Sequence, residues 1–503
     1  MRQENLRFVP MPEGEAASAD FAVFVENVQV PVYVCRVSAA PINQVWPGYE
    51  RPLEQTELAS FVSFDMTGPV TVEVRSLTKR VESVEIRPQE YGMEPEVCHD
   101  SIRFEVREPC QCTVEVNGFH NALHLFANPA EDFSHLKGKP NVRYFGPGVH
   151  EPGKMVLGSN ETVVIEAGAV VYGGIEATGA ENVTICGHGI LDTSRHPRPQ
   201  LVLDKVKDAQ TGGTNTTLIQ SKELVNGCMR FRNVKGLHIS GVICRDSNVW
   251  TITPTNCEDI RIRNVKLIGM WRYNSDGIDF CNCRRCELTD SFLRTFDDGV
   301  VFKGLPYNGK NEDGSLRMGE APEQHILVRN CVFWCDWGRA IEIGVETYDE
   351  ELTDIVVEHC QVIRCVHVAV DIQNGHRADV HDIRFEDIAF ELDPVNPAPV
   401  MQSYRDEKYE NHDPSFVPRL FAGYVFEWTP QPVKPRGQIR NVTVKNLRCY
   451  GPVKAPSLLY GYDETHCVDG VTFEDVSFNG VPARTAEEMA LEVRRFCKNV
   501  TVR

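Results

Sequence analysis

The sequence predicts an all-β protein in which a right-handed parallel β-helix, a solenoid, follows an N-terminal β-sandwich domain. Three features favour this fold class: a short strand pattern recurs along most of the chain, alternating strands fill its beginning, and helical periodicity is almost absent. A chain of 503 residues is too long for one ordinary compact core, whereas a solenoid grows without widening its cross-section. The predicted domains are residues 1–133, the sandwich, and residues 134–503, the β-helix.

The first domain contains six short segments in which apolar and polar side chains alternate. Turn-forming residues separate the segments, which are VYVCRVSA, ASFVSFDM, VTVEVRSL, SVEIRP, SIRFEVRE and CTVEVNG. Alternation with a period of two places one face of each strand in a core, and the spacing is typical of a sandwich. The connector ANPAEDFSHLKGKPNV then leads into the solenoid.

From about residue 180 a pattern of two apolar-x-apolar halves around a short turn returns repeatedly. Its copies are NVTICGHGILD, GLHISGVICRD, DIRIRNVKLIG, RCELTDSFLRT, HILVRNCVFWC, DIVVEHCQVIR, DIRFEDIAFEL, NVTVKNLRCYG and GVTFEDVSFNG, mostly about 23 to 29 residues apart. This period is typical of parallel coils that stack at about 4.8 Å. In DIRIRNVKL the alternation predicts that Ile260, Ile262, Val265 and Leu267 face inward. A β-propeller is the alternative, but its blades need about 40 or more residues each.

Three longer segments, near residues 195–230, 305–323 and 395–435, interrupt the repeat and are predicted to be loops. They are rich in Pro, Gly and charged residues, as binding loops on a rigid scaffold often are. Near the end of the chain, TAEEMALEVRRF has helical spacing. We expect a short C-terminal capping helix there, followed by a last strand, NVTVR.

The charge balance excludes some classes of partner. The chain has 52 basic and 71 acidic residues, a net charge of −19, which disfavours nucleic acid and anionic membranes as partners. No run approaches the roughly 20 apolar residues of a membrane helix, and the first residues lack the apolar core of a signal peptide. We therefore expect a cytoplasmic protein.

The eighteen cysteines are scattered along the chain and are predicted to be reduced thiols. Cys281, Cys283 and Cys286 form a C-x-C-x-x-C pattern that could indicate a metal site. No second pair of ligands follows nearby, so buried packing thiols are the favoured interpretation.

Two acidic clusters lie one coil apart. Asp276 belongs to NSDGID and the pair Asp297 and Asp298 belongs to FDDG, 21 positions after Asp276. In a solenoid this interval stacks them on neighbouring coils, and Gly299 permits the turn that the pair needs. A single aspartate is more often a solvated turn residue, but three stacked carboxylates with Lys303 nearby favour a site. Like charges held close raise one another's pKa, so that one carboxyl stays protonated beside ionised ones, as glycosidic cleavage requires.

These motifs resemble those of glycoside hydrolase family 28, the polygalacturonases. NSDGID resembles the family's NTDG motif, and FDDGVVFK is similar to its DD-x-apolar-apolar-apolar-Lys segment. NVWTITPTNCEDIRIRNV resembles the coil before the family's active site, and WGRAIEIG stands where the family has GHG-x-S-I-G. The resemblance covers roughly residues 140–480. The preceding sandwich is similar to that of glycoside hydrolase family 49, the dextranases and isopullulanases.

The resemblance implies an inverting glycoside hydrolase that uses no metal or cofactor, with residues 134–503 as its catalytic domain. Asp297 would be the general acid that protonates the leaving oxygen, and Asp276 and Asp298 would together activate a water. Asn274 and Lys303 would orient the carboxylates or bind sugar hydroxyls. The substrate would be a carbohydrate, while a homo-oligomeric state stays open.

Two departures from the family pattern concern the substrate. Arg339 replaces the family's histidine, and the basic R-I-K motif, which grips a uronate carboxylate, should fall at Ala369 to Asp371, where HVAVDIQ has no basic pair. We therefore expect neutral or weakly charged glycosides to be preferred over polygalacturonate. Arg339 itself, or Arg377 in NGHRADV, is a candidate replacement for the missing charge.

Four further residues near the motifs have two interpretations each. Glu342 and Glu346 are either structural partners of Arg339 or ligands of ring hydroxyls. Trp271 and Trp337 flank the motifs and either stack on sugar rings or pack in the core.

Two other functions are compatible with a β-helix. A polysaccharide lyase abstracts a proton next to a uronate and needs Ca²⁺ or Arg and Lys bases. A non-catalytic carbohydrate-binding or structural solenoid needs no acid–base carboxylates and should tolerate their loss.

Overall fold

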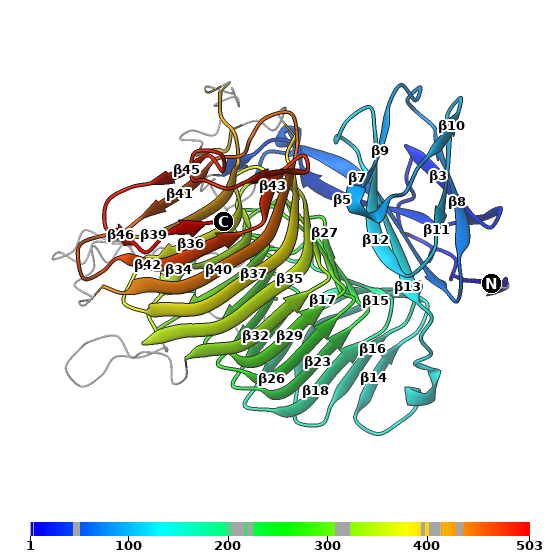
Figure 1. Cartoon of the computed structure of the whole chain (residues 1–503). Coiled ribbons are helices and arrows are strands. Elements are labelled where there is room, and N and C mark those ends of the chain that lie inside the picture. Colours follow the sequence, from blue (N-terminus) through cyan, green and yellow to red (C-terminus); the bar gives the residue numbers. More distant parts are fainter. Residues whose placement is uncertain are drawn as a thin grey trace.

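The computed structural model describes residues 2–3, 5–43, 51–198, 201–202, 217–218, 225–306, 322–393, 398–401, 413, 415–428 and 436–503. Over these residues the chain forms strands and three short 3-10 helices, η2 (Leu53–Gln55), η3 (Gln89–Tyr91) and η4 (Ser134–Leu136). Figure 1 shows a right-handed parallel β-helix with a two-sheet domain packed against its side, which confirms the predicted fold class. No helix among the described residues is long and apolar enough to cross a membrane.

The N-terminal domain consists of two facing sheets. The first contains β1 (Arg2–Gln3), β2 (Leu6–Arg7), β5 (Val32–Ser38), β7 (Thr56–Met66), β9 (Val84–Arg87), β12 (Cys110–Val116) and β13 (Leu123–Pro129). The second contains β3 (Phe21–Val25), β4 (Val28–Val30), β8 (Val70–Ser76), β10 (Glu96–Cys98) and β11 (Ser101–Val106). Alternate side chains of both sheets, among them Val23, Val72 and Val114, are buried between the sheets and form the core of a sandwich.

The remaining strands form one continuous sheet of 31 strands that winds into coils with three faces. Face A contains β14 (Val142–Phe145), β16 (Thr162–Ile165), β18 (Glu181–Cys186), β23 (Lys235–Ser240), β26 (Glu258–Arg263), β29 (Arg284–Thr289), β32 (Glu323–Arg329), β35 (Glu351–Cys365), β37 (Asp379–Glu391), β40 (Gln438–Tyr450), β42 (Val468–Glu474), β46 (Cys497–Lys498) and β47 (Thr501–Val502).

Face B contains β15 (Gly148–Leu157), β17 (Ala169–Thr178), β22 (Met229–Arg232), β25 (Ile252–Thr255), β28 (Ile278–Cys281), β31 (Val300–Gly304), β34 (Arg339–Thr347), β36 (Val368–Asn374), β39 (Arg419–Val425), β41 (Ser457–Tyr460) and β45 (Leu491–Val493). Face C contains the first halves of β15 and β17, then β19 (Ile190–Asp192), β24 (Ile243–Arg245), β27 (Lys266–Ile268), β30 (Phe292–Thr295), β33 (Val332–Cys335), the second halves of β35, β37 and β40, and β43 (Val476–Phe478) with its hairpin partner β44 (Val481–Ala483). Two small pairs lie outside these sheets: β6 (Ile42–Asn43) with β38 (Val400–Met401), and β20 (Leu201–Val202) with β21 (Thr217–Leu218).

The turn inside each repeat copy is a single residue in the left-handed conformation, which joins face A to face C. In the copies DIRIRNVKLIG, RCELTDSFLRT and HILVRNCVFWC it is Asn264, Asp290 and Asn330, with φ values of 54°, 53° and 54°. Asn and Asp adopt this conformation more readily than other residues with a side chain. The recurrence of these two residues in the repeat therefore follows from the corner geometry.

Inside the coils the apolar side chains stack in ladders. Ile260, Ile262, Val265 and Leu267 are 0–1% exposed, as predicted. Cys283 and Cys286 lie in the same core cluster, and all eighteen cysteines are free thiols. Among the described residues, no group of His, Cys, Asp or Glu could hold a metal ion.

The predicted C-terminal capping helix is wrong. Residues 486–490 form turns, and Leu491–Val493 is strand β45, which pairs with β41. Met489 and Leu491 are buried at the open end of the core. Strand β45 also forms hydrogen bonds with the backbone of β41, which a helix here would leave unpaired at the edge of the sheet. The last strand is confirmed as β47 (Thr501–Val502). Of the three predicted loops, 305–323 falls largely outside the described residues. The segment 395–435 contains strand β39 of the helix, so a loop over its whole length is wrong, and 195–230 ends in the start of β22.

The sandwich packs on face C through an apolar layer. Phe61 and Phe126 of the sandwich contact Phe292 and Trp334 of the helix in one buried cluster. Buried ion pairs border this layer: Arg364 Nη2 lies 3.0 Å from Glu115 Oε1, and Arg87, which also pairs with Glu115, reaches Glu391 of the helix. The large apolar contact and its satisfied charges join the two domains firmly.

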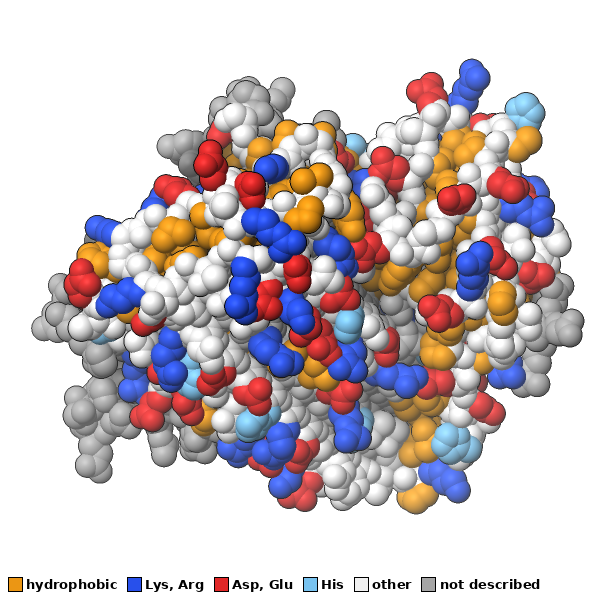
Figure 2. Space-filling model, viewed as in Figure 1, with side chains coloured by type: hydrophobic (Ala, Val, Ile, Leu, Met, Phe, Trp, Pro, Cys, Tyr) orange, Lys and Arg blue, Asp and Glu red, His pale blue; other side chains and the backbone are white. Residues whose placement is uncertain are grey.

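The outer surface of face A is laced with ion pairs between neighbouring coils. Arg284 pairs with Glu258 at 2.9 Å, and Lys445 pairs with Glu386 at 3.5 Å. Figure 2 shows that basic and acidic side chains are interspersed over this part of the helix. Such cross-strand pairs support the stacking of the coils. The mixture of charges does not give this face the uniformly positive potential that a polyanion would need.

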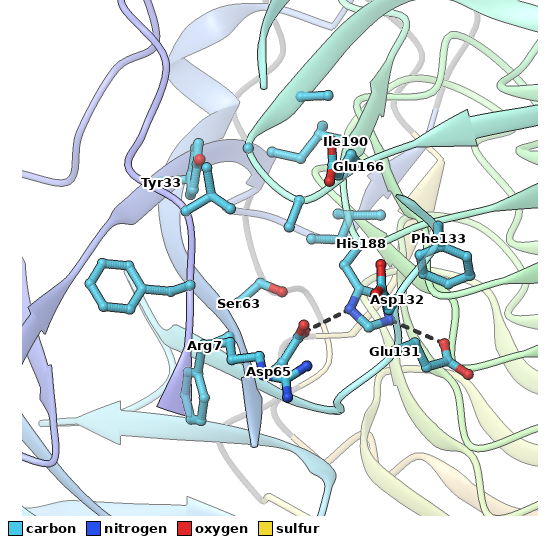
Figure 3. Close-up of a pocket in the computed structure, with 18 residues that line it drawn as sticks. Arg7, Tyr33, Ser63, Asp65, Glu131, Asp132, Phe133, Glu166, His188 and Ile190 are labelled. Atoms are coloured by element: carbon cyan, nitrogen blue, oxygen red, sulfur yellow. Dashed lines mark hydrogen bonds and ion pairs between the residues drawn. The ribbon is translucent and has the colours of Figure 1, made fainter. Parts of the chain in front are cut away.

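At the other end of the domain junction, a cavity of about 260 Å³ lies between the sandwich and the first coils. Figure 3 shows His188 of the helix between two carboxylates at its wall. The Nδ1 atom of His188 lies 2.6 Å from Asp65 Oδ1, and its Nε2 atom lies 3.4 Å from Glu131 Oε2. Burial and the nearby Lys266 oppose protonation, but the hydrogen bond to Asp65 and the close carboxylate of Glu131 outweigh them and raise the pKa of His188.

The contacts of His188 with Asp65 and Glu131 predict a pH-dependent contribution to stability. Because the folded-state pKa of His188 is raised, its contribution is complete below about pH 6.5, the ordinary histidine pKa, and is lost as the pH rises through the folded-state pKa. We expect His188→Gln to lower the free energy of unfolding by about 1.5–3 kcal/mol at low pH and by less at high pH. Urea denaturation of both proteins between pH 5.5 and 9 measures this difference. If the difference in unfolding free energy does not shrink with rising pH, His188 does not stabilise the fold as a protonated partner of Asp65 and Glu131.

Candidate active site

The structure brings the three predicted aspartates together at the corner between faces C and B. Asp276 directly precedes Gly277 and β28, while Asp297 and Asp298 connect β30 to β31 on the next coil. The two turns are hydrogen-bonded to each other, since Gly277 N donates to the carbonyl of Asp298 at 2.8 Å. All three side chains are at most 7% exposed. Their charges are therefore poorly screened by solvent.

A third turn, which joins β33 to β34, closes the cluster on the following coil. Its Arg339 backbone N–H donates to Asp298 Oδ1 at 2.8 Å. A Cβ atom added at Gly338 would lie 2.8 Å from Asp297 Oδ1 and even closer to Asp298 Oδ1. The absence of a side chain at Gly338 is what lets both carboxyl groups lie against this turn.

The two adjacent aspartates have opposite acid–base character. Burial and the charge of Asp298 raise the pKa of Asp297 to about 8. Burial also opposes ionisation of Asp298, but the Arg339 guanidinium and the contact with Glu342 outweigh it and lower its pKa. At neutral pH Asp297 therefore holds its proton, while Asp298 is ionised.

Asp276 belongs to a second group of buried charges around Lys303. The Lys303 ammonium lies 3.1 Å from Glu346, 3.7 Å from Asp279 and 4.0 Å from Asp276. Burial and the neighbouring Asp279 and Asp297 raise the pKa of Asp276 well above its usual value. The resemblance implied that Asp276 and Asp298 together activate a water, and of these two carboxyls Asp298 has a lowered pKa while Asp276 has a raised one.

Arg339 lies between carboxylates of three coils. Its Nη1 atom is 3.6 Å from Asp298 Oδ1, and its Nε atom is 3.6 Å from Asp371 Oδ2. Gln373 joins the neighbouring carboxyls by donating to Glu342 at 2.9 Å and to Asp371 at 2.9 Å. At the place where the family has its basic motif, this chain therefore has a buried carboxyl that already pairs with Arg339.

The structure places the remaining predicted residues in supporting positions. Trp271 is buried and donates from Nε1 to Asp246 at 3.0 Å, and Trp337 donates from Nε1 to the Val400 carbonyl at 3.3 Å. Asn274 accepts a hydrogen bond from Arg198 at 3.0 Å. Arg377 donates to the Tyr348 carbonyl at 2.8 Å, which ties it to the turn after β34.

The sequence reasoning missed two carboxyls and one aromatic residue. Asp279 is fully buried on face B, and burial raises its pKa to about 7 although Lys303 opposes the shift. Asp371 is likewise fully buried, with a pKa raised to about 7 by burial. The ring of Trp250 covers the Lys303 ammonium at 4.4 Å. Alternation gives a signal for Asp279, because Ile278 and Phe280 on either side of it point into the core.

Residues 173–420, which contain the whole cluster, match the family model described as Glycosyl hydrolases family 28. An exopolygalacturonase of Arabidopsis thaliana, clone GBGE184, is 24% identical to the chain over 266 residues, covering 47% of this chain and 56% of that protein. The chain thus matches only about half the length of this curated relative.

Two solved structures share the fold. Dex49A from Penicillium minioluteum aligns over 100% of this chain and 97% of its own, with a TM-score of 0.62 and 14% identity. A hyperthermoactive exopolygalacturonase from Thermotoga maritima aligns over 72% of this chain and 83% of its own, with a TM-score of 0.52 and 19% identity. The predicted resemblance to glycoside hydrolase family 28 is confirmed, and the likeness to Dex49A shows that the sandwich and the β-helix occur together in a known fold.

Proposed function

We propose that this chain, whose residues 173–420 match the family 28 model, is a glycoside hydrolase that cleaves an O-glycosidic bond by single displacement. The observation that supports this most is the pairing of a carboxyl whose pKa is raised to about 8, Asp297, with a neighbour whose pKa is lowered, Asp298. One acid and one base, held on a rigid corner of the helix, are the two groups that the reaction needs.

Each proton and bond in the reaction has a group to account for it. Asp297 donates its proton to the glycosidic oxygen while the bond between that oxygen and the anomeric carbon breaks. A water attacks the anomeric carbon from the opposite side and gives its proton to Asp298. Asp276, with its raised pKa, holds the water by hydrogen bonding. Because the water attacks directly, the anomeric configuration inverts.

The charges around the site favour an uncharged sugar. Two buried cations beside the aspartates, Lys303 and Arg339, already pair with carboxylates of the protein. A uronate carboxylate would lie among Asp298, Glu346 and Asp371 and would have to compete with them for those cations. This argues against hydrolysis of polygalacturonate, the activity for which the Arabidopsis relative is named. We propose a neutral oligo- or polysaccharide as substrate.

This proposal predicts the outcome of a screen of defined oligosaccharides. We expect neutral oligosaccharides to be hydrolysed with a kcat/KM at least tenfold above that for oligogalacturonides, because each unpaired buried charge contact costs more than about 1.4 kcal/mol, which is tenfold in rate. Product analysis by chromatography measures both activities, and absorbance of an unsaturated product would reveal a lyase instead. Efficient hydrolysis of polygalacturonate with no action on neutral substrates contradicts the assignment.

A further inference from the structure

The turns that carry the site begin where the sandwich domain packs. Strand β30 ends at Thr295, directly before Phe296 and the Asp297–Asp298 pair, and β33 ends at Cys335, directly before the turn that contains Gly338. Both strands lie on face C, and Phe292, Val332 and Trp334 belong to the apolar layer shared with the sandwich. The N-terminal domain therefore contacts the base of the Asp297–Asp298 turn and of the Gly338 turn.

The first contact is made by Arg51 of the sandwich. Its guanidinium carbon lies 4.0 Å from the centroid of the Phe296 ring, and the residue is only 2% exposed. Nη1 of Arg51 donates to the Ala40 carbonyl at 2.9 Å and to the hydroxyl of Ser38, so the cation is anchored in its own domain. A desolvated cation held over an aromatic face fixes the ring just before Asp297.

The second contact reaches the turn around Gly338. Strand β6 of the sandwich pairs with β38, where Val400 N donates to the Pro41 carbonyl at 3.1 Å. The Val400 carbonyl in turn accepts the indole N–H of Trp337 at 3.3 Å. The Trp337 ring stacks on Phe296 with centroids 6.3 Å apart, so the two contacts meet between the turns.

The third contact is polar and fully buried. Arg294 Nη1 lies 3.0 Å from His124 Nε2 of the sandwich, and Arg294 Nε lies 3.3 Å from Asp336 Oδ2. Asp336 is the first residue of the turn after β33 and also accepts from Trp334 Nε1 at 2.6 Å. The sandwich is thus connected through Arg294 to both catalytic turns.

We propose that the sandwich domain is a positioning part of the active site, in which Arg51 holds Phe296 and thereby the orientation of Asp297 and Asp298. The inference rests on the proposed function, since it assigns the domain a role in that same reaction. Misplacement of reacting groups by about 1 Å costs roughly 10²-fold in rate. A contact that sets the turn should therefore change kcat more than substrate binding.

Two variants of Arg51 and one matched control test this inference. Arg51→Met removes the charge and keeps the apolar volume, whereas Arg51→Lys keeps the cation. The control, Asp65→Asn, weakens another interdomain contact, the His188 pair, at the first coils. We expect Arg51→Met to lower kcat by roughly 10- to 100-fold with little change in KM, Arg51→Lys to restore much of it, and Asp65→Asn to lower Tm but leave kcat within about twofold.

Hydrogen exchange of the full-length protein gives a readout that needs no substrate. Peptides that span residues 295–299 and 336–339 should exchange faster in Arg51→Met than in wild type. In Asp65→Asn the exchange rates of these peptides should equal those of the wild type. If the wild type hydrolyses no glycoside, the proposed function fails and exchange alone decides the inference. Wild-type exchange of both turns in Arg51→Met, or wild-type kcat together with a lowered Tm, shows that the domain is only a structural support. If Arg51→Met does not fold, Arg51→Gln, which also removes the charge, takes its place in the same exchange comparison: faster exchange of both turns supports the inference, and wild-type exchange overturns it.

Discussion

Asp297→Asn should lower kcat by about 10²–10⁴-fold while substrate binding survives, because the amide keeps the shape of the carboxyl but has no acidic proton to donate. The pKa of Asp297 is raised to about 8, so in the wild type the donor is present at neutral pH and is lost as the pH rises through that value. We therefore expect the alkaline limb of the wild-type pH–rate profile to lie near pH 8 and to be absent in the variant. Steady-state kinetics from pH 5 to 10 measure both effects.

A glycoside with an activated leaving group separates the acid from the base. Such a leaving group needs little protonation, so the substrate should rescue Asp297→Asn far more than Asp298→Asn, which lacks the group that accepts the proton of water. Proton NMR of the first product should show inverted anomeric configuration. If Asp297→Asn and Asp298→Asn both keep near-wild-type turnover on a confirmed substrate, the reaction takes place elsewhere.

Gly338→Ala should lower kcat by roughly 10²-fold although it replaces no ionisable group. An added Cβ would lie 2.8 Å from Asp297 Oδ1 and 2.7 Å from the Asp298 backbone nitrogen, closer than real Cβ contacts. The carboxyl groups or the turn must then move by a sizeable fraction of an ångström, and displacement of about 1 Å costs roughly 10²-fold. Kinetics on the substrate found in the screen, combined with thermal unfolding, measure this effect.

Gly158→Ala is the matched control for this substitution. No heavy atom lies within 4 Å of a Cβ added at Gly158, and this glycine is not among those with a positive φ. We expect the control to keep wild-type kcat. Wild-type kcat in Gly338→Ala would show that turnover does not depend on the position that the Gly338 turn gives to Asp297 and Asp298.

Part of this architecture could be predicted from local patterns. The alternation in DIRIRNVKL placed Ile260 and Leu267 in the core, because strand side chains point to opposite faces whatever lies around them. The short turn inside each repeat copy was also predicted, and most copies have Asn or Asp there, whose preference for the left-handed conformation is a property of the residue itself. The interval from Asp276 to Asp297 likewise predicted stacked turns, because one coil has nearly constant length.

The helical spacing of TAEEMALEVRRF misled for the opposite reason. The pattern is local, whereas the strand that this segment pairs with, β41, lies about 30 residues earlier in the chain. The open edge of β41 and the exposed end of the core decide that Leu491 belongs to a strand. The helix preference of a short segment is weak, and tertiary packing overrides it.

Strand alternation, corner residues and coil length predict the β-helix, the sandwich and the stacking of the three aspartates, because each is set within one or two coils. The sequence offered the difference in acid–base character between Asp297 and Asp298 only through a family resemblance, and its physical cause lies in the tertiary structure. The pKa of Asp297 depends on its burial, and that of Asp298 on Arg339, which arrives from another coil. The same holds for Asp371 and Arg51, whose importance comes from contacts with Arg339 and Phe296. Burial and charge at a site are sums over residues distant in sequence, and folding alone brings them together.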